Sequence, residues 1–204
     1  VKRTIRDHKR VIFNGNGYDD AWLEEAQRRG LLNLKTTPDC MPYFLKEKNI
    51  RLFESHKVFS ETEIRSRYEI LMENYCKVLH IEALTMLEMV KRDIIPSVSD
   101  YVAELCRNVA SKQAVSGSIP CDSEKDVIAK LAELNDKTYK AAQQLESHLK
   151  AIDKDDIKPA SQSMAHVIIP DMERVRALVD GMETLTSSDF WPYPTYFDLL
   201  YSVK

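Results

Sequence analysis

One amphipathic pattern, from Ser60 to about Ala114, constrains the fold of this chain more than any other feature. Its apolar residues recur at steps of three and four, which is the spacing of a helix face and not of a strand. The helix begins with a capping box. The Ser60 hydroxyl accepts a hydrogen bond from the backbone N–H of Glu63, and the Glu63 carboxylate accepts one from the backbone N–H of Ser60. The apolar face comprises Leu71, Tyr75, Leu79, Ala83, Met86, Val90, Ile94, Val98, Val102, Leu105 and Val109.

Pro96 lies inside this pattern, where it removes one backbone donor and crowds the carbonyl of Arg92. Ile94 and Val98 nevertheless stay on the same face, whereas a loop would usually reset the phase of the pattern. We therefore predict one continuous helix that is kinked at Pro96, and not two helices with a loop between them.

Two further helical patterns follow a loop at residues 116–122, and a charged turn at 153–156 separates them. The first begins at Ser123 and the second near Pro159 or Ala160, and Pro170 interrupts the second without changing its phase. The apolar faces are Val127, Leu131, Leu134, Thr138, Ala142, Leu145, Leu149 and Ile152 in the first, and Met164, Ile168, Met172, Val175, Val179, Met182 and Leu185 in the second. Three long helices with short loops predict an up-down-up bundle.

We expect one all-α domain in three parts: an N-terminal connecting segment with short helices (1–59), the proline-kinked three-helix bundle (60–187), and an aromatic tail (188–204). Pro192 and Pro194 bar a helix from the first half of the tail. Such an aromatic segment stays in solution by lying in a groove between helices. The tail is therefore predicted to dock on the bundle.

The N-terminal segment contains short elements with clear local signals. Residues 11–13 are apolar and predict a strand-like or extended stretch. A helix follows, with Asp19 or Asp20 as its cap and Gly30 as its end. A second short helix is expected at Thr37, which would be its N-cap, with proline at the first helical position.

Composition narrows the function classes. The chain is 44% hydrophobic and 30% charged with five glycines, so it can bury a core and favours helices over strands. Its formal net charge is −3, without a basic stripe interleaved with aromatic residues, so we expect no nucleic-acid partner. No apolar run approaches the roughly 18–20 residues that cross a membrane. With no secretory signal, and a first residue that we expect not to be a native terminus, a cytoplasmic location is expected.

The search for chemistry finds no catalytic, cofactor-binding or metal-binding residues. Histidines at 8, 56, 80, 148 and 166 form no H-x-x-x-H or H-E-x-x-H motif. Glu82 and Glu88 do not share a helix face, and the Glu69–Glu73 pair fits a solvated one. The chain has four cysteines, at positions 40, 76, 106 and 121. We expect Cys40, Cys76, Cys106 and Cys121 to be reduced and mostly buried, and a disulfide pair is the alternative.

A glycine-rich turn at residues 14–17, between an apolar run and a helix, permits a second interpretation as a phosphate loop. The dinucleotide fingerprint requires a third glycine where this chain has Asp20. Asp19 and Asp20 also place negative charge where a phosphate would bind. A plain turn followed by a helix cap is favoured over the phosphate loop.

Three stretches together resemble the C-terminal region of type III glutamine synthetase, the large bacterial and protist form. The first comprises RVIFNGNGY at 10–18, WLEEA at 22–26 and RGL at 29–31. The second comprises FSETEI at 59–64, RYE at 67–69 and IE at 81–82. The third comprises WPYPTY at 191–196 and LLY at 199–201. The first and third stretches are the distinctive ones, and the resemblance extends over essentially the whole chain.

The resemblance implies a parent enzyme that joins glutamate and ammonia at the expense of ATP, with Mg or Mn, in a double-ringed oligomer. The family's metal, phosphate and ammonia residues lie upstream of the position that matches Val1, so no catalytic role is carried over to this chain. The resemblance implies a structural, oligomerisation or regulatory module whose partners are the catalytic domain of the same chain and neighbouring identical subunits. The alternative is a free-standing helical adaptor with a protein partner of its own.

Overall fold

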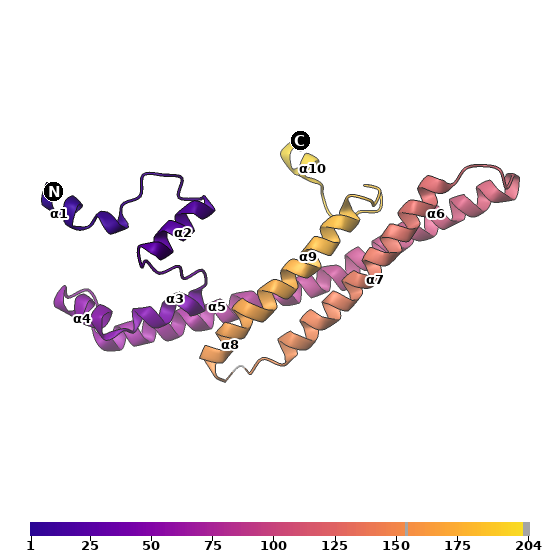
Figure 1. The fold of residues 1–204 in the computed structure, drawn as a ribbon. Helices are drawn as coiled ribbons and strands as arrows, with labels where there is room; N and C mark the ends of the chain where they lie inside the picture. The colour runs from indigo at the N-terminus through magenta and orange to yellow at the C-terminus, as the bar shows by residue number, and fades with distance from the viewer. Residues whose placement is uncertain (154, 202–204) are drawn as a thin grey trace. The chain divides into compact units, whose positions relative to one another are not determined.

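The computed structural model describes residues 1–153 and 155–201, and these residues form helices and connecting segments without a β-strand (Figure 1). The prediction of an all-α chain is confirmed. The chain divides into two compact units, Val1–Arg65 and Ser66–Lys204. The boundaries expected from the sequence, at 59/60 and 187/188, stay predictions.

The first unit contains short helices that are joined by turns, and the second contains the long ones. The elements of the first unit are α1 (Lys2–Asp7), the 3-10 turn η1 (Lys9–Val11), α2 (Asp20–Arg28), α3 (Thr37–Phe44) and α4 (Glu47–Ser55). The long helix α5 (Glu61–Met89) starts at the end of the first unit and continues into the second. The other elements of the second unit are the π turn η2 (Val90–Ile94), α6 (Ile95–Val115), α7 (Asp122–Lys150), α8 (Ile157–Ser163), the π turn η3 (Met164–Ile168), α9 (Ile169–Glu183) and α10 (Tyr196–Tyr201).

The predicted caps of α2 are present. The Asp19 carboxylate accepts from the backbone N–H of Ala21 at 3.1 Å, which satisfies a donor that the first turn leaves unpaired. Gly30, with φ of +68°, directly follows the helix and its C-cap residue in the left-handed conformation that glycine tolerates. The expectation of a strand-like or extended stretch at residues 11–13 holds only in part, because Val11 closes the 3-10 turn while Ile12 has extended backbone angles.

One cap lies one residue earlier than predicted. The N-cap of α3 is Thr36, whose hydroxyl accepts from the Asp39 N–H at 3.3 Å, and Thr37 is the first helical residue. Both threonines precede Pro38, and either could cap a helix with proline in its first turn. The extended backbone at Thr36, with φ of −122° and ψ of 158°, decides between them.

The capping box at the start of α5 is confirmed. The backbone N–H of Ser60 donates to the Glu63 carboxylate at 2.8 Å, and the Glu63 N–H donates to the Ser60 hydroxyl at 3.3 Å. Ile64, the next residue, is fully buried. The helix therefore starts where its local sequence provides partners for its first backbone donors.

The helical backbone is continuous from α5 through η2 into α6, as the phase of the pattern predicted. Just before Pro96 the turn widens, and the Ile95 N–H bonds to the carbonyl of Val90, five residues earlier. The same widening precedes Pro170, where the Ile169 N–H bonds to the carbonyl of Met164. Each π turn accommodates one extra residue, so apolar residues at steps of four stay on one face. The kinks themselves stay predictions.

The three long helices of the second unit share one core, in which α7 packs against both α6 and α9 (Figure 1). Most of the predicted apolar faces supply this core, but Leu71 is 47% exposed and does not belong to it. The buried cluster is Ala83, Leu87, Val90, Ile94, Val98, Leu131, Ala141, Ala142, Leu145, Leu149, Met164, Ile168, Val175 and Met182.

Ion pairs connect α7 to η2 and to α6. Lys91 of η2 binds Glu146 at 2.5 Å, and Lys112 of α6 binds Glu124 in the first turn of α7. The ammonium of Lys112 holds the pKa of the Glu124 carboxyl at about 2, with backbone and Ser123 hydrogen bonds contributing in the same direction. Each pair joins residues on two different elements, so the pairs hold α7 in register with η2 and α6.

The tail contacts the bundle through its first aromatic residues. Trp191 and Tyr193 pack against the core cluster, and the Phe190 ring lies 5.2 Å from that of Tyr101. The Tyr193 hydroxyl donates to the Asp93 carboxylate at 2.7 Å. Burial, followed by the neighbouring Asp93 carboxylate, raises the pKa of Tyr193 to about 12. The side chains of residues 196 and 197, which were also expected to dock, lie outside the described part of the chain.

Pro96→Ala is expected to keep the fold. The helix already continues through this position, and alanine fits helical backbone angles. The free energy of unfolding should change by no more than about 1 kcal/mol, since proline's restriction of the unfolded chain is lost while helix propensity improves. Circular dichroism during heating measures both helix content and midpoint. Leu145→Ala, at a fully buried site, is the control that should cost about 2–5 kcal/mol. A loss of helix content in Pro96→Ala would contradict the continuous helix.

Truncation after Ser188 should lower the thermal midpoint. It removes the apolar contacts of Trp191 and Tyr193, which we expect to stabilise the bundle by about 2 kcal/mol net. That corresponds to a fall of roughly 4–8 °C for a chain of this size. Tyr193→Phe is the matched variant, because it loses only the hydrogen bond to Asp93 and should cost about 1 kcal/mol. An unchanged midpoint at low protein concentration would show that the tail adds nothing within the chain.

Candidate functional site

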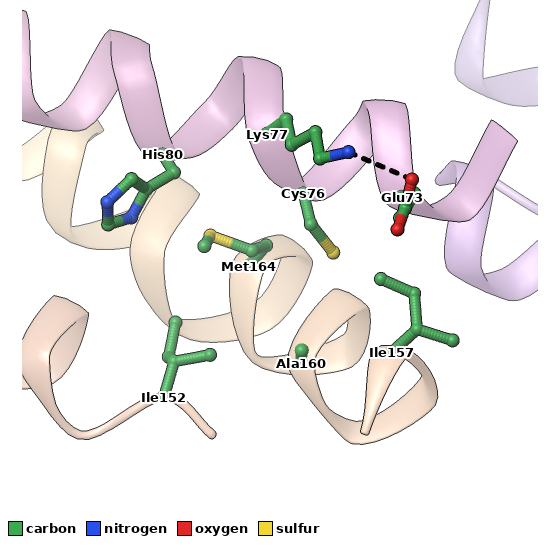
Figure 2. A pocket seen from close by; sticks show the side chains of 8 residues that line it. All are labelled: Glu73, Cys76, Lys77, His80, Ile152, Ile157, Ala160 and Met164. Carbon is green, nitrogen blue, oxygen red and sulfur yellow. Dashed lines mark hydrogen bonds and ion pairs between the residues drawn. The ribbon is translucent and has the colours of Figure 1, made fainter. Parts of the chain in front are cut away.

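A partly enclosed pocket of about 200 Å³ lies in the second unit, between α5 and side chains that come from just after α7, from α8 and from the start of η3 (Figure 2). The wall from α5 is polar and the facing wall is apolar. The polar wall comprises Glu73, Cys76, Lys77 and His80, and the apolar wall comprises Ile152, Ile157, Ala160 and Met164.

Helical spacing brings the four polar residues together. Positions 73, 76, 77 and 80 are three and four residues apart, so they occupy one face of α5. Figure 2 shows the Cys76 sulfur directed toward Ile157 and Ala160, while Lys77 reaches back to Glu73. The opposing residues come from elements some 75 positions later in the chain, roughly the span of one long helical hairpin.

Two features describe the chemistry of this pocket: an ion pair and a protonated thiol. Lys77 Nζ lies 2.9 Å from a Glu73 oxygen, so these two charges satisfy each other at the mouth. Burial raises the pKa of the Cys76 thiol, which keeps it protonated near neutral pH. A protonated thiol is a poor nucleophile. The pocket therefore combines an apolar wall with a protonated thiol and an ion pair.

A second hollow, the α5–α9 groove, is larger and more open, at about 460 Å³. It runs along the second half of α5 and η2 on one side and along α9 on the other. Its apolar lining includes three methionines, whose flexible thioethers adapt to differently shaped partners. The lining comprises Ile81, Glu82, Thr85, Met86, Met89, Val90, Ile94, Met172, Val175, Arg176, Val179 and Asp180.

A polar cluster joins α7 to α9 in the bundle. His148 Nδ1 lies 2.6 Å from Oδ2 of Asp171, which is almost completely buried. Arg174 lies 3.7 Å from the other Asp171 oxygen and donates to the Gln144 side chain at 3.1 Å. A buried carboxylate is costly without such partners. Asp171 therefore serves as a connection between helices.

The structure separates the residues that the sequence singled out. His148 meets a carboxylate and His80 lines the pocket, while His8 and His56 lie in the first unit. Across residues 1–153 and 155–201, no three His, Cys, Asp or Glu side chains gather as metal ligands would. The prediction that the chain carries no catalytic, cofactor-binding or metal-binding residue stays a prediction.

The cysteine prediction is partly wrong. The four thiols are free, but Cys40 and Cys106 are exposed, Cys76 is half-buried and only Cys121 is buried. Cys106 occupies the outer side of α6, which its position in the sequence alone did not reveal. No helix in the described part of the chain is both long enough and apolar enough to cross a membrane.

Comparison with known proteins assigns the chain to a region of one enzyme. A family model described as the glutamine synthetase C-terminal domain matches residues 1–113. A glutamine synthetase of Butyrivibrio fibrisolvens is 39% identical over 100% of this chain and 29% of its own length. A type-3 glutamine synthetase of Dictyostelium discoideum is 31% identical over 98% of this chain and 28% of its own length. The chain thus spans less than a third of these curated relatives.

Cys76 should react with iodoacetamide more slowly than the exposed Cys106, by roughly tenfold or more near neutral pH, because burial lowers its thiolate fraction. Since its pKa is raised, its alkylation rate should keep increasing at a pH above the usual thiol range of about 8.5. Peptide mass spectrometry of the native chain measures both rates. The rates should converge in denaturant, which is the control. A Cys76 that reacts as fast as Cys106 in the native chain would contradict the buried thiol.

Proposed function

The chain belongs to the family of glutamine synthetase C-terminal domains, and from this we propose that it is the non-catalytic helical domain of a type III glutamine synthetase. The parent enzyme would join glutamate to ammonia at the expense of ATP, with Mg or Mn as its metal. The domain would contribute structure, subunit contacts or regulation. Its partners would be the catalytic domain of the same chain and neighbouring identical subunits.

The observation that carries this proposal is the extent of the match. The two relatives align with 100% and 98% of this chain, yet the chain accounts for only 29% and 28% of their lengths. The greater part of a synthetase of this kind therefore lies in other residues, where its catalytic groups would be found. A match over essentially the whole chain also favours a synthetase domain over a free-standing adaptor.

The state of the charged side chains supports a structural role. Glu146 accepts from both Lys91 and Lys150, which lower the pKa of its carboxyl. Asp171 is committed to His148 and Arg174. Carboxylates that act on metal ions or ammonia must instead face a site that a substrate can enter. These carboxylates connect helices.

An exposed apolar face on α5 supports a role in assembly. Several large apolar side chains on this helix are open to solvent, among them Ile70 at 61% and Ile81 at 63%. Together with Leu71, Val78 and Leu84 they follow the same side of the helix, at steps that suit packing on another surface. Apolar patches of this kind mark contact sites for other protein surfaces.

The expected outcome of a nucleotide titration tests the non-catalytic part of the proposal. The 204-residue chain, shown to be folded by circular dichroism, should release no binding heat when titrated with ATP and magnesium, or with ATP and manganese. It should also form no glutamine from glutamate and ammonia. A full-length synthetase of the same family serves as the positive control. Micromolar binding of ATP to the folded chain would contradict a domain without catalytic groups.

A further inference from the structure

One row of side chains leads along α5 into the π turn. Glu82, Met86, Met89 and Asp93 follow one another at steps of four, three and four, so they occupy one side of the helical backbone. The first three line the α5–α9 groove. Asp93 follows them in η2, at the end of the row.

The tail reaches the bundle at this end of the groove. The Tyr193 hydroxyl donates to Asp93 at 2.7 Å, and the carboxylate of Glu88 also lies close enough to act on Tyr193. Trp191 packs against the same core cluster as Val90 and Ile94, which form part of the groove. The tail is therefore attached at η2, next in sequence to the groove residue Ile94.

A helix with exposed leucines begins three residues after Tyr193. Thr195 and Asp198 form a capping box: the Thr195 N–H donates to the Asp198 carboxylate at 2.9 Å, and the Asp198 N–H donates to the Thr195 hydroxyl at 3.3 Å. The helix α10 then exposes 63% of Leu199 and 74% of Leu200. A helix of six residues is unstable alone in water, so it gains stability only by packing against another surface.

We propose that α10 is a strap that closes over the α5–α9 groove of its own chain, with Leu199 and Leu200 inserted between the methionines of its walls. The structure shows the open arrangement, with both leucines in solvent. Asp93, which holds Tyr193, lies in η2 between the groove residues Val90 and Ile94, so closure starts beside an existing contact. Met86, Met89 and Met172 can adapt to the inserted leucines because their side chains are unbranched.

The attachment at Asp93 selects α10 over other occupants. Because Tyr193 is held two residues before the capping box, α10 stays at a high effective concentration beside the groove. A second molecule would lose translational and rotational freedom on binding, whereas the tethered helix does not. Closure removes the leucines of α10 and the apolar lining of the groove from water together.

Hydrogen exchange of the complete chain tests this strap. In the wild type at low protein concentration, the amides of α10 and of groove residues 81–90 should exchange at least tenfold more slowly than in the double variant Leu199→Asp, Leu200→Asp. Val115→Asp is the matched control, because Val115 is 81% exposed at the end of α6 and has no place in the groove. It should leave both rates unchanged. Ile81→Asp, on the groove side, should release α10 as the double variant does.

Three results would overturn the proposal. The amides of α10 could exchange in the wild type at the rate of an unstructured peptide. The groove could exchange equally fast in the wild type and the double variant. Protection of α10 could also appear only as protein concentration rises, which would assign the groove to a second copy of the chain. Ile81→Asp separates closure from general unfolding, because it changes an exposed side chain and leaves the buried core intact.

Discussion

The burial of α7 between α6 and α9 is the contact on which the second unit depends. Leu131, Ala142 and Leu145 on this helix are fully buried, and Thr138 among them satisfies its hydroxyl by donating to the carbonyl of Leu134 at 2.8 Å. Close-packed interiors allow little rearrangement. This row of buried side chains therefore sets the axial register of α6 and of α9 against α7. The pairs Lys91–Glu146 and His148–Asp171 both require this register, because each joins α7 to a neighbouring element.

The two π turns place the functional surfaces on this core. Each ends on the first residue of an Ile-Ile-Pro sequence, at residues 94–96 and 168–170, and in each case that isoleucine is buried in the common cluster. Proline cannot donate to the preceding turn, and a wide turn relieves its crowding of the backbone. η2 carries the groove residue Val90 and the tail contact Asp93, while η3 begins with Met164 of the pocket.

Several reactive or charged groups of the second unit are protonated, enclosed or paired. Cys76 is held as a thiol, Asp171 is enclosed between helices, and the pocket charges Glu73 and Lys77 are paired with each other. Beyond the core, apolar side chains remain on the surface of the unit. They lie on the exposed face of α5, in the α5–α9 groove and at the leucines of α10. Such a distribution suits a domain whose role depends on what packs against it, in agreement with its place in the glutamine synthetase family.

The sequence by itself determined the long helices, the capping box at Ser60, the continuity through Pro96 and the family, because each depends on residues within a few positions or on direct similarity. It left the cap of α2 open between Asp19 and Asp20, and it did not predict α1 or α10. Single positions that depend on neighbours in space were missed, such as the exposed Leu71 and Cys106. Only the tertiary structure decided the pocket, the groove and the contact between Asp93 and Tyr193, which are 100 residues apart. Periodicity specifies which face of a helix is apolar, but the partner of that face follows from packing between distant segments.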